Sequence, residues 1–262
     1  MTIDYRGMTA LVTGASSGIG VEFATQLAAR GANLVLVARR ADRLETLATE
    51  LRTAHSVTVD VIPTDLAKPR AGRSLRAEIS KRGLTVNTVI ANAGFGTSEL
   101  FQDEDPDRIA DEIALNVAAV VDIARAFYPA MLTAGTGALV TVASTAAFQP
   151  VPKMAVYGAT KAFVLSFTEA LWYESRHSGL RVLALCPGAT ATEFFDVAGN
   201  GERFGFNRDT AANVVKRAMK ALDKRKGAGS LVSGAGNAFG AIAVRMIPRR
   251  LAATMAGRLT GA

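Results

Sequence analysis

The chain is short of the residue types that build disulfide scaffolds and metal sites. Its 262 residues contain one cysteine, two histidines and one tryptophan. A lone cysteine has no partner, so a disulfide-stapled secreted scaffold is excluded. His55 and His177 lie far apart in polar surroundings, which leaves too few ligands for a zinc site and no base for a Ser-His-Asp hydrolase. Cys186 follows an apolar run, and we expect a packed thiol there rather than a nucleophile.

The sequence also shows no pattern of a signal peptide or of a membrane-spanning helix. The opening residues, MTIDYRGMTALV, do not place a basic segment before a long apolar stretch. We find no run of the ~18 apolar residues that a membrane-spanning helix needs. We therefore expect a cytoplasmic protein. A hydrophobic content of 49% over residues 1–262 predicts one α/β domain with a substantial core.

Acidic residues are outnumbered by basic ones. There are 30 Lys and Arg against 23 Asp and Glu, a net charge of +7. Such an excess can indicate nucleic acid, an anionic membrane surface or an anionic small ligand. The basic residues are mostly scattered, and the adjacent ones, such as Arg39 and Arg40, are not interleaved with aromatic residues. This favours a solvated surface and an anionic cofactor, without a nucleic-acid partner.

Residues 9–20, TALVTGASSGIG, have the pattern of a strand, a tight turn and the start of a helix. Gly14, Gly18 and Gly20 let the backbone turn sharply and approach another group. The first N–H groups of the helix then converge on one point, where a phosphate can bind. The spacing G-x-x-x-G-x-G differs by one residue from the general G-x-G-x-x-G fingerprint. An ordinary glycine-rich connection is the alternative.

Apolar runs and amphipathic stretches alternate along the whole chain. This alternation predicts right-handed β-α-β crossovers and a doubly wound parallel sheet of about seven strands, with helices on both faces. Ligands of such sheets bind beyond the carboxyl ends of the strands. The expected strands cover about 10–12, 33–38, 57–62, 85–91, 137–143, 180–185 and 229–233.

Three polar residues of the second half can carry proton chemistry. Tyr157 and Lys161 are four residues apart on an expected helix, so they share one face. A neighbouring ammonium favours the phenolate and lowers the pKa of a tyrosine from about 10. Ser144 ends an expected strand and can face the same substrate oxygen. The alternative is a surface Tyr-Lys pair and a capping serine.

Together these positions resemble the short-chain dehydrogenase/reductase family. TGASSGIG at the first turn, NAG at 92–94, YGATK at 157–161 and PG at 187–188 follow the family's order, with Asp65, Asn116 and Ser144 between them. The resemblance runs from about Met8 to Ser233 and includes the unusual glycine spacing. It implies a Rossmann-type fold that binds a nicotinamide dinucleotide.

The resemblance also implies catalytic roles. Tyr157 would pass a proton to or from the substrate oxygen while hydride moves at the nicotinamide. Lys161 would lower the tyrosine pKa and hydrogen-bond the nicotinamide ribose. Ser144 would polarise the carbonyl group, and Asn116 would hold a water that relays protons onward from the lysine.

Cofactor contacts follow from the same resemblance, one segment at a time. The first turn would hold the pyrophosphate and the adjacent ribose, and the later segments would border the adenine, the adenosine ribose and the nicotinamide. In that order, the implied residues are Gly14, Ser16, Ser17, Gly18, Ile19 and Gly20, then Asp65 and Leu66, then Asn92, Ala93 and Gly94, then Pro187, Gly188, Thr190 and Thr192.

The residues after the second strand bear on cofactor choice. NAD-binding proteins usually place an acid there, which hydrogen-bonds the adenosine ribose. This chain has Ala38 followed by Arg39 and Arg40. A guanidinium pairs with a 2′-phosphate, so NADP(H) is expected, with Arg39 as the principal contact and Arg40 in solvent. The alternative is that both arginines face water.

Aromatic and aliphatic residues surround the expected substrate position. A lid over 190–207 contains Phe194, Phe195, Phe204 and Phe206, and across the site lie Phe95, Phe148, Val151 and Met154. An apolar cleft of this kind suits a hydrophobic ketone, aldehyde, secondary alcohol or 3-oxoacyl chain. The same residues would equally suit a core or a subunit interface.

The C-terminal segment, 237–262, departs from the family pattern. It is apolar and basic, and Pro248 would interrupt a single helix. We expect it to close the substrate pocket or to pack in a subunit interface, and we keep weak peripheral contact with a membrane as the lesser alternative. A homo-oligomer, either a dimer or a tetramer, is expected.

The expected function is an NADP(H)-dependent oxidoreductase that interconverts a carbonyl and a secondary alcohol. The alternative is a redox sensor that binds NADP(H) on the same fold without turnover. A third possibility, an epimerase or dehydratase of the extended branch, is disfavoured because that branch needs a larger substrate domain.

Overall fold

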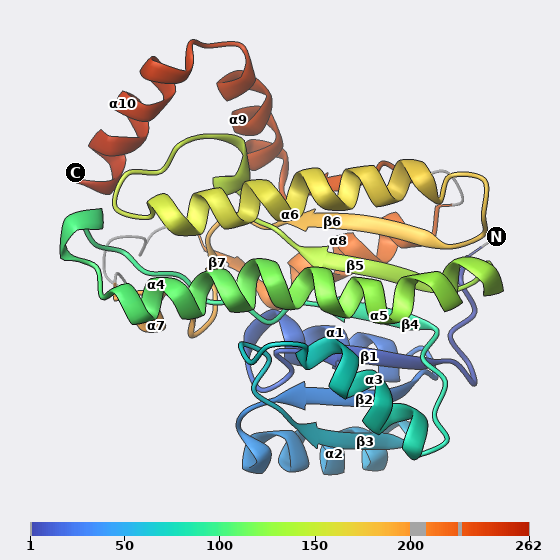
Figure 1. The fold of residues 1–262 in the computed structure, drawn as a ribbon. Coiled ribbons are helices and arrows are strands. Elements are labelled where there is room, and N and C mark those ends of the chain that lie inside the picture. The colour runs from blue at the N-terminus through green and yellow to red at the C-terminus, as the bar shows by residue number, and fades with distance from the viewer. Residues whose placement is uncertain (1, 200–207, 225–226, 262) are drawn as a thin grey trace.

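The computed structural model describes residues 2–199, 208–224 and 227–261, and its centre is one parallel sheet of seven strands (Figure 1). The strand order is β3-β2-β1-β4-β5-β6-β9. All neighbours are parallel, and successive crossovers run toward one edge of the sheet up to β3 and toward the other edge from β4 onward. This confirms the doubly wound α/β fold. The strands are β1 (Thr9–Thr13), β2 (Asn33–Ala38), β3 (Val59–Pro63), β4 (Thr88–Ala91), β5 (Ala138–Val142), β6 (Arg181–Cys186) and β9 (Ser230–Val232).

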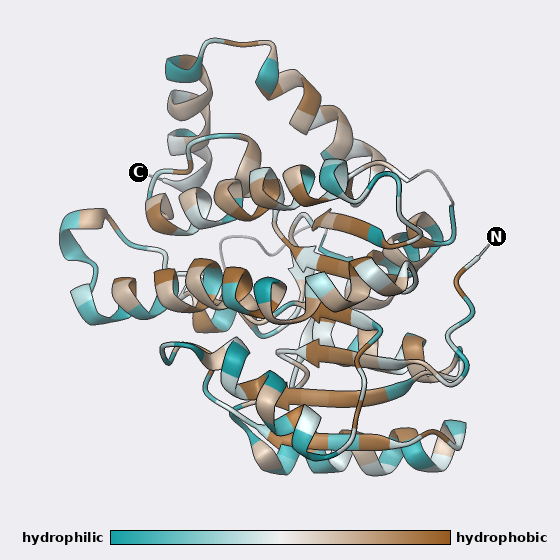
Figure 2. Ribbon diagram, turned by 45° about the vertical axis from the view of Figure 1, so that its right-hand side comes forward, coloured by the Kyte–Doolittle hydropathy of each residue, from teal (hydrophilic) through white to brown (hydrophobic). Residues whose placement is uncertain are grey.

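Helices cover both faces of the sheet because its strands are apolar on both sides. In β1, Ala10 and Val12 belong to one core cluster while Leu11 belongs to the other. The first cluster is covered by α1 (Gly18–Ala28), α2 (Ala41–His55) and α8 (Ala211–Leu222), and the other face by α3 (Ala71–Lys81), α5 (Ala119–Ala134) and α6 (Ala155–Glu174). In Figure 2 the strands are brown through the centre, and the outer faces of several helices are teal.

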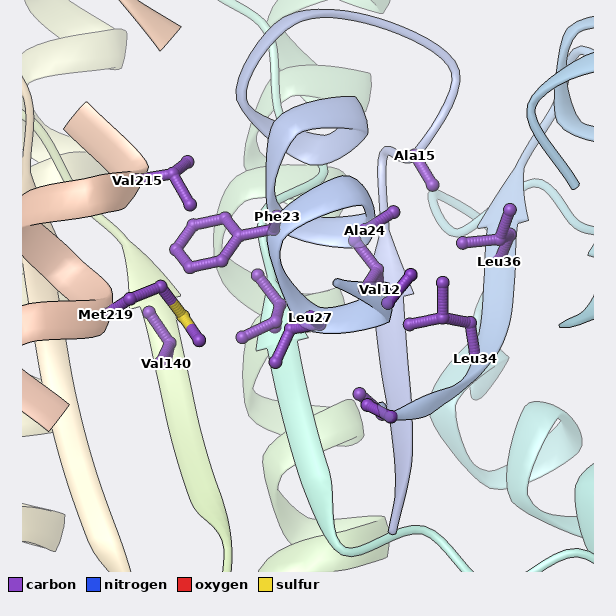
Figure 3. Packing of buried hydrophobic residues seen from close by; sticks show 14 of the residues in the cluster. Val12, Ala15, Phe23, Ala24, Leu27, Leu34, Leu36, Val140, Val215 and Met219 are labelled. Atoms are coloured by element: carbon purple, nitrogen blue, oxygen red, sulfur yellow. The ribbon is translucent and has the colours of Figure 1, made fainter. Parts of the chain in front are cut away.

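Phe23 of α1 illustrates how the first cluster is packed (Figure 3). Its ring points toward Val215 and Met219 of α8, and Leu27 follows one turn later on α1. All four side chains are fully buried. These contacts fix α1 and α8 side by side over the centre of the sheet, and the N-terminus of α1 thereby lies at the carboxyl edge of β1.

The expected helix 107–132 is one helical run with a widened turn inside it. It comprises α4 (Pro106–Ile113), the π-helical turn η2 (Ala114–Ala118) and α5. Within the turn, the N–H of Ala119 donates to the carbonyl of Ala114. By length and apolar composition the whole run could cross a membrane, contrary to the sequence prediction that no segment qualifies. Ile123 and Phe127 of α5, however, pack in the second core cluster.

The segments after β6 form smaller elements around the carboxyl edge of the sheet. The expected lid contains β7 (Thr190–Ala191) and α7 (Phe194–Val197), and β7 pairs with β8 (Asp209–Thr210). Phe204 and Phe206 lie outside the described residues. The C-terminal segment is broken at Pro248, as expected, into α9 (Ala235–Arg245) and α10 (Arg249–Thr260).

Two buried glutamates share one hydroxyl group beside α4. Thr97 Oγ1 lies 2.8 Å from Glu104 Oε1 and 3.0 Å from Glu112 Oε2. A threonine hydroxyl carries a single proton, so one carboxyl group must itself be protonated to complete both hydrogen bonds. Glu112 is fully buried, and this burial, together with the nearby Glu104 carboxylate, raises its pKa to about 7. The fold therefore holds a proton on this pair near neutral pH.

The raised pKa of Glu112 predicts a stability that depends on pH. In the unfolded chain the carboxyl group ionises near its ordinary value of 4.5, so the folded state binds the extra proton between that pH and about 7. The free energy of unfolding should therefore fall as pH rises through this window. Glu112→Gln should remove this loss of unfolding free energy, which amounts to at most about 3 kcal/mol above pH 7.

Urea unfolding of both proteins from pH 4.5 to 8 tests this. The exposed carboxylate of Glu99, in the same loop as Thr97, supplies the matched control Glu99→Gln. If the free energies of unfolding of Glu112→Gln and the parent differed by a constant amount across this range, the glutamate pair would not hold the extra proton.

Candidate active site

The carboxyl ends of six strands open onto one cavity of about 750 Å³. Because all seven strands are parallel, the residues that follow them meet at the same edge. Gly14, Arg39, Asp65, Asn92, Ser144 and Pro187 follow β1, β2, β3, β4, β5 and β6, and all line the cavity. So do Ser16, Ser17, Gly18, Ile19, Arg40, Leu66, Ala93, Gly94, Tyr157, Lys161, Gly188, Thr190 and Thr192. Among the catalytic and cofactor-binding residues expected from the sequence, Gly20 and Asn116 do not line the cavity.

The turn between β1 and α1 is packed too tightly for side chains. Gly14 has φ +66°, and a Cβ atom there would lie 2.7 Å from Asn92 Nδ2. A Cβ atom on Gly20 would lie 2.2 Å from the carbonyl oxygen of Gly14. Ser17 precedes α1 without a capping hydrogen bond from its side chain, so the first N–H groups of the helix face the cavity uncapped. This arrangement fits the pyrophosphate of a dinucleotide.

Asn92 and Thr13 tie the ends of two neighbouring strands together. The side-chain amide of Asn92 donates to the carbonyl of Thr13 at 3.0 Å. In return, the backbone N–H groups of Asn92 and Ala93 both approach Thr13 Oγ1, at 3.0 and 3.1 Å. These bonds fix the floor of the cavity between the glycine turn and the centre of the sheet.

The proton-transfer residues meet at the opposite end of the cavity. Tyr157 and Lys161 lie on α6, are 8% and 5% exposed, and have the lysine Nζ 5.6 Å from the centre of the phenol ring. The ammonium group donates to the carbonyl of Val142, the last residue of β5, at 2.8 Å. Ser144 starts the short helix η3 (Thr145–Phe148) two residues later and hydrogen-bonds the Tyr157 hydroxyl. The helix and the strand end thus bring all three side chains together.

The electrostatics differ from the sequence expectation. Burial raises the pKa of Tyr157 to about 12, although the hydrogen bond from Ser144 lowers it. Burial also lowers the pKa of Lys161 to about 8. The expected depression of the tyrosine pKa by Lys161 is wrong for the protein alone, because burial is the largest influence on the phenol and the opposing influence comes from Ser144. Tyr157 is therefore a protonated hydroxyl at neutral pH.

Asn116 lies behind this group and holds a loop in place. Its amide donates to the carbonyl of Phe95 at 2.8 Å and to Thr160 Oγ1 at 3.2 Å, and its Oδ1 accepts from the N–H of Phe95 at 3.1 Å. The side chain is occupied by these protein partners, so a relay water would have to bind elsewhere on the residue. Asn116 lies in the π-helical turn, a distortion that is frequent at functional sites.

The outer part of the cavity is apolar, as the sequence predicts. Phe194 of the lid lies 5.1 Å from the ring of Tyr157, centre to centre. Residues of the C-terminal helices line this part as well, so the tail lies against the cavity. The apolar lining comprises Phe95, Phe148, Val151, Met154, Phe194 and Phe195 from the body, with Val244, Ile247, Ala252 and Met255 from the tail.

Arg39 and Arg40 differ in their surroundings. Arg39 is exposed at the mouth of the cavity. The sequence prediction that Arg40 lies in solvent is wrong. Its side chain donates to Ser16 Oγ at 3.0 Å and pairs with Glu193 at 2.9 Å. The same carboxylate accepts from Arg43, and the two arginines lower the pKa of Glu193.

Several site residues were missed by sequence reasoning. Glu193 meets Arg40 and Arg43 from far along the chain, and Asn237 Nδ2 would lie 2.3 Å from a Cβ atom on Gly188. No sequence signal marks these two contacts. Glu112 was detectable, because an acid four residues before Asn116 falls on the buried face of the expected helix.

Other chemistries find no support in the described residues. Within them, no group of three or more His, Cys, Asp or Glu side chains could hold a metal ion. Cys186 is fully buried at the end of β6, and burial raises the pKa of its thiol to about 12. It is a packed thiol, as expected.

Comparisons with known proteins agree with this geometry. A short chain dehydrogenase from Sphingobium yanoikuyae in complex with NADPH has 34% identity and a TM-score of 0.82, covering 91% of this chain and 93% of that one. A very-long-chain 3-oxoacyl-CoA reductase of Bos taurus is 30% identical over 83% of this chain and 69% of its own length. An inactive hydroxysteroid dehydrogenase-like protein of Homo sapiens is 31% identical over 72% of this chain, which spans 58% of that relative.

The family model for short chain dehydrogenases matches residues 8–203. That range includes the glycine turn, the Asn92 loop and the group of Ser144, Tyr157 and Lys161 described above. The chain therefore belongs to the short-chain dehydrogenase/reductase family of oxidoreductases.

Proposed function

We propose that the protein is an NADP(H)-dependent oxidoreductase that interconverts a carbonyl and a secondary alcohol on a hydrophobic substrate. The observation that carries this is the place of the Tyr157 hydroxyl, where the dinucleotide cradle meets the apolar end of the cavity. When bound, the nicotinamide ring would donate or accept the hydride. The chain's own residues would handle the proton and the substrate oxygen.

Proton transfer would fall to Tyr157, assisted by two neighbours. Its hydroxyl is protonated at neutral pH because burial raises its pKa to about 12. In the direction of reduction it can therefore donate this proton to the carbonyl oxygen without first taking one up from solvent. Ser144 can donate to the same oxygen and polarise the carbonyl. Lys161 lies within 5.6 Å of the phenol ring and would stabilise the phenolate left after transfer.

NADP(H) is proposed rather than NAD(H) on the charges after β2. Ala38 stands where an acid would repel a 2′-phosphate, and Arg39 and Arg40 follow it into the cavity mouth. Arg40 is already oriented by Ser16, next to the turn that would hold the pyrophosphate. The relative from Sphingobium yanoikuyae was solved with NADPH, which supports the assignment.

A hydrophobic substrate is proposed from the apolar side chains around the outer cavity. Phe194 covers Tyr157, and Ile247 and Met255 extend the apolar wall along the tail. The bovine relative's name specifies a very-long-chain 3-oxoacyl substrate. A ketone or 3-oxoacyl group on a long apolar chain would fill this space.

A second candidate is a redox sensor that binds NADP(H) without turnover. The name of the human relative, which calls it inactive, is the observation in its favour. Against it stands the complete set of Ser144, Tyr157, Lys161 and Asn116, since a protein that only binds the dinucleotide has no need of an acid-base pair.

Tyr157→Phe should abolish turnover and leave cofactor binding intact. The variant keeps the ring against Phe194 and loses only the hydroxyl, so kcat for reduction of a carbonyl panel should fall by ~10²- to 10⁴-fold. The dissociation constant of NADPH, measured by fluorescence titration, should stay within about twofold.

Tyr173→Phe is the matched control, because this tyrosine lies on α6 and is exposed. Full activity in Tyr157→Phe would refute the acid-base assignment. Tight NADPH binding by the parent with no turnover on any carbonyl of graded chain length would favour the sensor.

Arg39→Ala should weaken NADPH binding and leave NADH binding unchanged. Loss of one charge-assisted contact to the 2′-phosphate should raise the dissociation constant of NADPH by roughly 10- to 100-fold. Calorimetric titration with both cofactors measures the change, and Arg73→Ala, an exposed arginine on α3 outside the cavity, is the control. Tighter binding of NADH than NADPH by the parent would overturn the cofactor assignment.

A further inference from the structure

The two C-terminal helices expose large apolar side chains on their outer side. Phe239 and Ile242 of α9 are 75% and 63% exposed, and Met246, just after α9, is 82% exposed. On α10, Leu251 is about half exposed. In Figure 1, α9 and α10 (red) stand as a hairpin above the rest of the fold. We call these four residues the outer face of the tail.

The inner side of the same helices is also apolar, because it lines the cavity. Ala241 and Val244 of α9, Ile247 of the connection, and Ala252 and Ala256 of α10 all line it. A helix that covers a core normally has one apolar side and one polar side. Here both sides are apolar, so contact with the cavity does not explain the outer face.

Charge on the tail has a single sign. Residues 235–262 contain Arg245, Arg249, Arg250 and Arg258 and no aspartate or glutamate. All four arginines are exposed. Exposed apolar side chains flanked only by cations match the interface of an anionic bilayer, where the apolar groups enter the headgroup boundary and the cations meet the phosphates.

A second copy of the chain fits this face less well. In a symmetric dimer the same patch meets itself, so the arginines of the two copies would be brought together with no acid of either tail between them. Such like-charge contact is unfavourable, whereas an anionic lipid surface neutralises it. The overall charge of +7 likewise repels a second copy of the chain and attracts an anionic surface.

We propose that the outer face of α9 and α10 docks on an anionic lipid membrane. Docking there brings the two helices that cover the apolar end of the cavity onto the lipid surface. The docking does not depend on the proposed reaction. In a cytoplasmic protein the target is the anionic cytoplasmic leaflet.

Co-sedimentation of the full chain with lipid vesicles tests the docking. Vesicles of phosphatidylcholine with phosphatidylglycerol (7:3) are compared with phosphatidylcholine alone, at low and high salt. The parent should bind the anionic vesicles, and binding should weaken with salt. The triple variant Phe239→Ser/Ile242→Ser/Met246→Ser should lose binding, and Arg249→Gln/Arg250→Gln should weaken it by about fivefold per arginine.

Matched controls separate docking from folding and from net charge. Arg73→Gln/Lys81→Gln removes two exposed cations from α3, and its vesicle binding should equal that of the parent. None of the substituted tail residues lines the cavity, so NADPH affinity and circular dichroism should be unchanged in every variant. Tyr157→Phe should still dock, so a failure of the proposed catalysis would leave the docking result standing.

Three results would overturn the proposal. The first is no binding of the parent to anionic vesicles at low salt. The second is equal binding to neutral and anionic vesicles, which would remove the role of the arginines. The third is a dimer in sedimentation velocity that the triple variant dissociates, without vesicle binding, because the outer face would then be an interface between two copies of the chain.

Discussion

The hydrogen bond from Lys161 to the carbonyl of Val142 fixes the relation between α6 and the sheet. It anchors a buried ammonium group at the end of β5, two residues before Ser144. The serine, the tyrosine and the lysine consequently meet although the helix that carries the last two begins eleven residues after Ser144. Movement of α6 along its axis would separate them, and this contact opposes such movement together with the hydrogen bond between Thr141 of β5 and Thr168 of α6.

Burial is the dominant electrostatic influence on that group. It raises the pKa of Tyr157, lowers that of Lys161 and raises that of Glu112, each toward the uncharged form. At neutral pH Tyr157 is uncharged, whereas Lys161, with a pKa of about 8, still carries its positive charge. The proposed substrate, a neutral carbonyl on an apolar chain, agrees with the phenylalanines around this end of the cavity.

Much of the fold and site was accessible from the sequence because it depends on local pattern. Alternating apolar strands and amphipathic helices predicted the parallel sheet, and parallel strands place Gly14, Asn92 and Ser144 at one edge. The break at Pro248 was also predictable, since proline lacks the N–H that a continuous helix needs. The family resemblance added the roles of individual residues.

The remainder depends on contacts across the fold, which spacing does not encode. The pairing of Arg40 with Glu193 joins residues 153 positions apart, and neither neighbourhood marks it. The pKa of Tyr157 depends on how completely α6 is covered, and the sequence pattern suggested only the nearby ammonium. The widened turn at Asn116 was hidden within an otherwise regular helical pattern.

The carboxylate of Glu193 would make entry of the proposed dinucleotide an exchange of counter-ions at Arg40. It comes from the segment just before α7 and is held by Arg40 and Arg43. A phosphate that approached Arg40 would meet a tethered competitor of the same sign. Displacement of Glu193 from Arg40 would remove one of the two ion pairs that hold the segment carrying Phe194, whose ring covers Tyr157.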